Sequence, residues 1–200
     1  GFVLNNLIWG LSILVVFFIG FLLFGDEMAG LFGSLIFALI PQGILWSNTT
    51  AVEPSAALWA GLAFLSVILF VRYPEKSMLF LASVLLPFAF QFRAESFLIA
   101  LPAGFTVVLL AREELKKEVV YAFILLLLAL ALPHLIHTYA VMGEGWGASG
   151  GGKFDLKYLR QNFEVNGLFY LSNDRFPFLF TLLFIFGLVI PMRKVFQDNS

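Results

Sequence analysis

The chain has 200 residues, of which 60% are hydrophobic and 12% are charged, and its mean hydropathy is +0.94. Because a soluble domain carries about 25% charged residues, this composition excludes an ordinary water-soluble domain and indicates a membrane protein. The net charge of −1 gives no basis for nucleic-acid binding, and the lack of cysteine excludes disulfides and thiolate chemistry.

Seven apolar runs follow one another along the chain, separated by polar or charged segments. A membrane-spanning helix needs ~20 apolar residues, and the first run reaches that length. The fourth and fifth runs are short, so we expect helical residues of the polar segments beside them to extend both. The pattern predicts an all-α fold, a polytopic transmembrane bundle of about seven helices. The runs cover residues 2–24, 28–46, 56–71, 77–92, 97–110, 119–136 and 176–191.

Alternation along these runs predicts which polar segments share a side of the membrane. The turns 25–27, 72–76 and 111–118 share one side with the C-terminal tail, and the short islands 47–55 and 91–96 share the other. Because short loops rich in lysine and arginine face the cytoplasm, we expect the islands and the N-terminus to face outward from the cell membrane. The basic residues of the inner group are Arg72, Lys76, Arg112, Lys116, Lys117, Arg193 and Lys194.

The long polar stretch 138–175 is expected to be an external loop within a single transmembrane domain that covers residues 1–200. Leu156, Leu159 and Phe163 recur there at helical spacing, which predicts a short amphipathic helix on the outer interface. No soluble domain, internal repeat or signal peptide is visible. Because the chain lacks an initiator methionine, we expect it to belong to a longer protein.

Three charged residues of the outer islands are candidates for a polar pocket. Glu53 precedes Pro54, so it is either a pocket acid or a solvated carboxylate near a positive helix N-terminus. Arg93 and Glu95 form either an interfacial ion pair or an anion site. An outward arginine opposes the positive-inside trend, and a guanidinium matches phosphate oxygens with two parallel hydrogen bonds. A phosphate ligand at the outer face is therefore a reasonable hypothesis.

Two histidines, His134 and His137, lie three residues apart at the outer end of the sixth run. They are either a metal pair or two interfacial imidazoles. Two histidines are fewer ligands than a protein zinc site normally has, so we favour the interfacial interpretation and assign no metal ligand. His137 is the better candidate for the pocket. No cofactor is assigned, and a divalent metal ion stays open as an alternative.

Several short segments resemble the GT-C class of membrane glycosyltransferases. Thr-Thr-Ala-Val-Glu-Pro at residues 49–54, after a helix that ends near Pro41, is similar to the opening of a helix in that class. Phe-Gln-Phe-Arg-Ala-Glu-Ser at residues 90–96, followed by Leu101 and Pro102, resembles its recurrent Thr-Arg-Pro-Glu segment and trailing Leu-Pro. Here Gln91-Phe92 and Ala94 replace the usual threonine and proline. The nearest branch is the polyprenyl-phosphate-sugar-dependent one, like protein mannosyltransferases and aminoarabinose transferases.

The resemblance implies an integral-membrane enzyme that transfers a sugar from a polyprenyl-phosphate-linked donor to a glycan, lipid or protein acceptor on the extracytoplasmic side. Glu53 corresponds to the second pocket acid of that class, and the main base is expected upstream of Gly1. The substrate-binding candidates are Arg93, Glu95, Gln91 and His137. Membrane lipids are the remaining partners, and this part of the enzyme is expected to be inactive alone.

Two other functions compete with the glycosyltransferase. A transporter or flippase bundle also keeps polar residues at helix breaks, but it is expected to place charges near mid-helix and to show inverted repeats. In this sequence the candidate charges lie at the outer ends of the runs, so the enzyme is favoured. A third alternative is that the protein is a non-catalytic membrane scaffold.

Overall fold

The computed structural model describes residues 1–116 and 118–140, together with 160, 163–165, 167, 170, 171, 177–183 and 185. The chain divides into two compact units, residues 1–39 with 43–146 and residues 40–42 with 147–200. In the second unit, residues 178–183 are helical, which covers part of the seventh predicted run. Residues 141–159, which contain most of the predicted amphipathic helix, lie outside the described residues.

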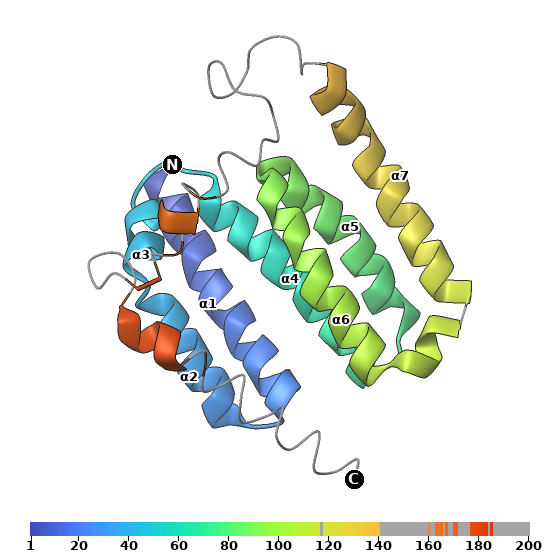
Figure 1. Cartoon of the computed structure of the whole chain (residues 1–200), viewed down its shortest axis with the longest axis horizontal. Coiled ribbons are helices and arrows are strands. Elements are labelled where there is room, and N and C mark those ends of the chain that lie inside the picture. Colours follow the sequence, from blue (N-terminus) through green and yellow to red (C-terminus); the bar gives the residue numbers. More distant parts are fainter. Residues whose placement is uncertain are drawn as a thin grey trace. The chain divides into compact units, whose positions relative to one another are not determined.

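Within the described residues the fold is all helical, as predicted. The helices are α1 (Phe2–Phe24), α2 (Glu27–Ala38), α3 (Pro41–Ser47), α4 (Glu53–Arg72), α5 (Lys76–Phe92), the 3-10 helix η1 (Ala94–Ile99), α6 (Ala100–Leu110), the 3-10 helix η2 (Arg112–Lys116) and α7 (Glu118–Ala140) (Figure 1). The first six apolar runs are therefore helical, and η1 extends the short fifth run toward the polar island, as expected.

Three described helices, α1, α4 and α7, are long and apolar enough to cross a membrane. The second run is broken, because α2 and α3 meet at an angle of 65° just before Pro41, and together they make a fourth candidate span. Proline lacks the N–H that a continuous helix would need. Helices α5 and α6 are shorter apolar helices. The all-α membrane helix bundle is confirmed, and length and composition alone identify three or four candidate spans among the described residues.

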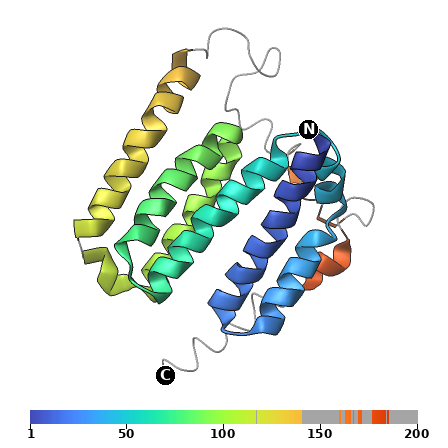
Figure 2. The same cartoon turned by 180° about the vertical axis from the view of Figure 1, so that it is seen from behind.

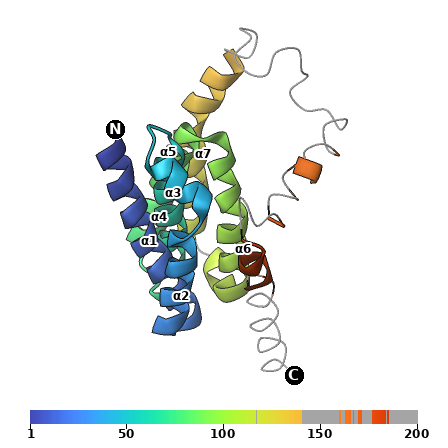
Figure 3. The ribbon, with the colours of Figure 1, turned by 90° about the vertical axis from the view of Figure 1, so that its left-hand side faces the viewer.

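Helix α4 lies at the centre of the first unit. It contacts α1, α5 and α6, and in the view of Figure 3 α1 lies at the left of the bundle and α6 to its right. Its buried face includes Ala63, Val67 and Phe70, and the hydroxyl of buried Ser66 donates to the carbonyl of Leu62 within the same helix. Many large apolar side chains point outward instead, as expected where lipid rather than water is the surrounding solvent.

The helix ends of this unit gather into two groups. At one end, Arg72 Nε and Nη2 both donate to the carbonyl of Leu22, at 2.9 and 2.7 Å. At the other end, Asn5 Nδ2 donates to the carbonyls of Thr49 and Ala51, each at 2.8 Å, and Figure 2 shows the chain start beside the segment that joins α3 to α4. The turns 25–27 and 72–76 therefore share one end, and the N-terminus and the first island share the other, as alternation predicts.

Candidate functional site

The two polar islands meet at one end of the first unit. Glu53 is the first residue of α4, and Arg93 is the residue at which α5 ends and η1 begins. Arg93 has an extended backbone, with φ −148° and ψ 128°, so the helix stops there and the side chain is turned toward α4. Glu95 follows in the first turn of η1. The two islands, predicted to share one side, are in contact there through Glu53 and Arg93.

The guanidinium of Arg93 lies between two carboxylates. Its Nη1 donates to Glu53 Oε1 at 2.5 Å, while its Nε and Nη2 donate to Glu95 Oε2 and Oε1 at 3.3 and 3.4 Å. The Glu53 side chain is 21% exposed, that of Arg93 38% and that of Glu95 67%. The Glu53 contact is therefore short and sheltered, whereas the Glu95 contact is long and open to solvent.

Electrostatics favours the charged forms of Arg93 and Glu95. The hydrogen bond from Arg93 is the largest cause that lowers the pKa of Glu95 below its ordinary value, and the hydrogen bond to Glu95 is the largest that raises the pKa of Arg93. Each partner thus favours the charged form of the other. Two carboxylates and one guanidinium leave the cluster with a net negative formal charge. An anion that approaches Arg93 is therefore repelled by the two carboxylates.

The other two predicted site residues are not brought onto Arg93. Gln91 is exposed in the last turn of α5, and His137 is exposed near the end of α7. The side chain of neither makes a hydrogen bond or ion pair with another described residue. Instead His134, one turn earlier, packs edge-on against Phe90 with ring centroids 4.6 Å apart. Spacing alone could not show which of the two histidines faces α5, because that depends on how α7 is rotated about its axis.

Aromatic side chains flank the cluster on α5. Phe88 packs edge-on against Trp59 of α4 and against Phe92, with centroids 4.9 and 5.2 Å apart, and Phe90 contacts Phe97 of η1 at 5.5 Å. Sequence reasoning missed this arrangement, although the four-residue spacing of Phe88 and Phe92 is the signal that predicts a shared helix face. These rings support the backbone on both sides of the break at Arg93.

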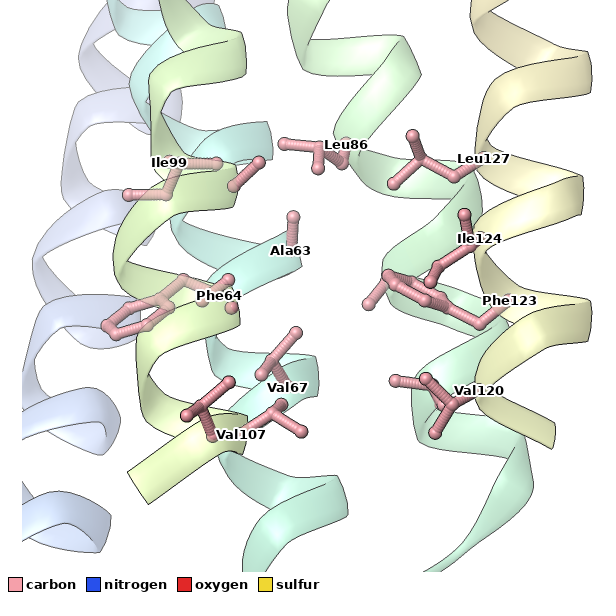
Figure 4. A pocket seen from close by; sticks show the side chains of 16 residues that line it. Ala63, Phe64, Val67, Leu86, Ile99, Val107, Val120, Phe123, Ile124 and Leu127 are labelled. Atoms are coloured by element: carbon pink, nitrogen blue, oxygen red, sulfur yellow. The ribbon is translucent and has the colours of Figure 1, made fainter. Parts of the chain in front are cut away.

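An apolar groove of about 230 Å³ runs between α4, α5, α6 and α7. Figure 4 shows Phe123, Ile124 and Leu127 of α7 facing Ala63 and Val67 of α4 across it. Small side chains leave the space open, because they cannot fill the gap between helices that larger neighbours hold apart. The small lining residues are Ala63, Ala82, Ala100, Ala103 and Gly104.

One end of the groove is connected to the charged cluster by the short helix η1. Its lining includes Ile99 at the end of η1, and Glu95 lies in the first turn of that helix. At ~2 Å of rise per residue, four residues of a 3-10 helix separate these points by roughly 8 Å. A charged head with an apolar tail therefore fits the two features together. Among the described residues, no group of three or more histidine, aspartate or glutamate side chains is placed to hold a metal ion.

Comparison with known proteins gives one match. A family model described as dolichyl-phosphate-mannose-protein mannosyltransferase matches residues 2–137. The matched region runs from the start of α1 into the last turns of α7 and contains Glu53, Arg93 and Glu95. No curated protein and no solved structure matches the chain.

Proposed function

The chain belongs to the dolichyl-phosphate-mannose-protein mannosyltransferase family of GT-C membrane glycosyltransferases, and we propose that it transfers a sugar from a polyprenyl-phosphate-linked donor to a glycan, lipid or protein acceptor. The acceptor hydroxyl oxygen bonds to the anomeric carbon of the sugar. The bond from that carbon to the phosphate oxygen breaks, and the phosphate keeps the electron pair. A general base takes the hydroxyl proton, so the products are the glycosylated acceptor and polyprenyl phosphate.

The observation that carries this proposal is that η1 connects Arg93, at its start, to Ile99, which lines the apolar groove. A polyprenyl phosphate has an anionic head and a long apolar tail, and these two properties match the guanidinium and the groove in turn. Negative charge develops on the phosphate oxygens as the sugar leaves, and a cationic donor held at that point stabilises the transition state.

Each remaining site residue has a role in this proposal. Glu53 anchors Arg93 from α4 and is the second acid of the pocket. Gln91 and His137 are exposed in the described structure, which leaves both side chains accessible to the sugar or to the acceptor. The reaction takes place at the end of the bundle that holds both islands, which we assign to the extracytoplasmic face because the opposite end has more short-loop lysine and arginine.

The test is sugar transfer by the purified full-length protein in liposomes. One donor is the radiolabelled sugar on a polyprenyl phosphate, and the other is the same sugar on a nucleoside diphosphate. We expect labelled acceptor and free polyprenyl phosphate from the lipid-linked donor alone. Transfer from the nucleotide-linked donor without transfer from the lipid-linked donor would overturn the proposal.

A further inference from the structure

Glu95 occupies the edge of the Arg93 guanidinium that suits a phosphate best. Its two carboxylate oxygens accept from Nε and Nη2 separately, at 3.3 and 3.4 Å. This is the planar fork that also binds two phosphate oxygens side by side. Glu53 accepts from the remaining terminal nitrogen, Nη1. A phosphate cannot use the fork while Glu95 holds it.

The two carboxylates differ in how easily they can leave. The Glu53 contact is 2.5 Å long, its side chain is 21% exposed, and it joins α4 to the end of α5. The Glu95 contacts are longer, its side chain is 67% exposed, and it is two residues from Arg93 in the same chain. Exposed ion pairs of this kind contribute little to stability, because water screens them and the side chains must be ordered.

We propose that Glu95 holds the phosphate position on Arg93 when the donor is absent, and that the donor phosphate displaces it while Glu53 keeps Arg93 in place. This inference rests on the proposed function and names the group that the donor replaces. Charge requires the exchange, since a phosphate added to a cluster that is already negative would meet repulsion from both carboxylates. Rotation of an exposed side chain into solvent removes the nearer charge without moving a helix.

The exchange also serves product release. After transfer, polyprenyl phosphate stays on the same fork as the donor did, and it carries more negative charge than the donor's phosphodiester. Glu95 then competes for the guanidinium and shortens the time that the product stays bound. Removing the carboxylate is therefore expected to tighten both donor and product, which is the opposite of what loss of a substrate-binding residue would do.

The experiment measures binding of a polyprenyl phosphate and of the neutral polyprenol to the full-length protein in nanodiscs. Glu95→Gln keeps the size of the side chain and removes its charge. We expect it to lower the Kd for polyprenyl phosphate about twofold to fivefold, with no change for polyprenol, in line with the small energy of an exposed pair. The matched control is Glu75→Gln, which removes an exposed carboxylate at the opposite end of the unit and should change neither Kd.

Steady-state kinetics of Glu95→Gln should show the same tighter binding of donor and product. In Glu95→Gln the KM for the lipid-linked donor should fall, and inhibition by added polyprenyl phosphate should strengthen by a similar factor. If wild type prefers polyprenyl phosphate over polyprenol and Glu95→Gln binds it no more tightly, the exchange is wrong and the proposed function stands. If wild type binds polyprenol as tightly as polyprenyl phosphate, the phosphate site itself is wrong, and the exchange is overturned with it.

Discussion

Replacing Arg93 by lysine separates charge from geometry at the candidate site. The arginine makes one hydrogen bond of 2.5 Å to Glu53 and presents a two-donor fork on its other edge. A lysine ammonium can keep the Glu53 contact but offers no planar fork. A charge-assisted hydrogen bond contributes roughly 1.5–3 kcal/mol, and loss of one that forms mainly in the transition state slows the reaction roughly tenfold to a hundredfold.

The assay for Arg93→Lys is sugar transfer from a polyprenyl-phosphate-linked donor by the purified full-length protein, with kcat and KM measured separately. Arg93→Ala should be slower still, because it also leaves the sheltered Glu53 carboxylate without its partner. Arg72→Lys is the matched control, since Arg72 also donates from Nε and Nη2 but to a backbone carbonyl at the opposite end. Wild-type rates in Arg93→Lys, or equal losses in the two lysine variants, would refute a forked phosphate contact.

Three further predictions test the groove, the helix packing and the orientation. Gly104→Leu projects into the groove, where an added Cβ meets nothing within 4 Å, and should raise the KM for long-chain donors more than for short-chain ones. Gly30→Ala should lower the free energy of unfolding by about 1–3 kcal/mol, because its Cβ would lie 2.7 Å from a backbone oxygen of α1, whereas Gly10→Ala, with open space around it, should not. A cysteine at exposed Thr50 should react with an impermeant thiol reagent from outside intact cells, and one at Ser77 should react only after permeabilisation.

The helices and their grouping could be predicted from the sequence because both depend on length and alternation. An apolar run of spanning length forms a helix in a membrane whatever its neighbours are, since every backbone group must be paired within the segment. Alternation then assigns each turn to an end, which is enough to bring Glu53 and Arg93 together across α4 and α5. The number of membrane crossings was harder to predict. Helices α5 and α6 are shorter than a membrane-spanning helix, and the second run is broken before Pro41.

The groove could not be predicted, because it depends on how helices are rotated rather than on where they begin. Small residues at positions such as Ala63 and Ala103 occur in many membrane helices, where they usually let two helices approach closely. In this structure they face α7, which lies far enough away to leave open space between Phe123 and α4 (Figure 4). The same rotation decides that His134 rather than His137 packs on Phe90.

The contact between Arg93 and Glu95 depends on the exact residue at which α5 ends, which the polar island 91–96 located only to within a few residues. In a continuous α-helix, residues two apart point to different sides and cannot share a fork. Arg93 leaves the helix with an extended backbone, and η1 begins directly after it, so the two side chains come to lie side by side. No proline or glycine stands at the break itself. The ion pair with Glu53 therefore has a structural role as well, because it links α4 to the guanidinium at the point where the chain leaves α5.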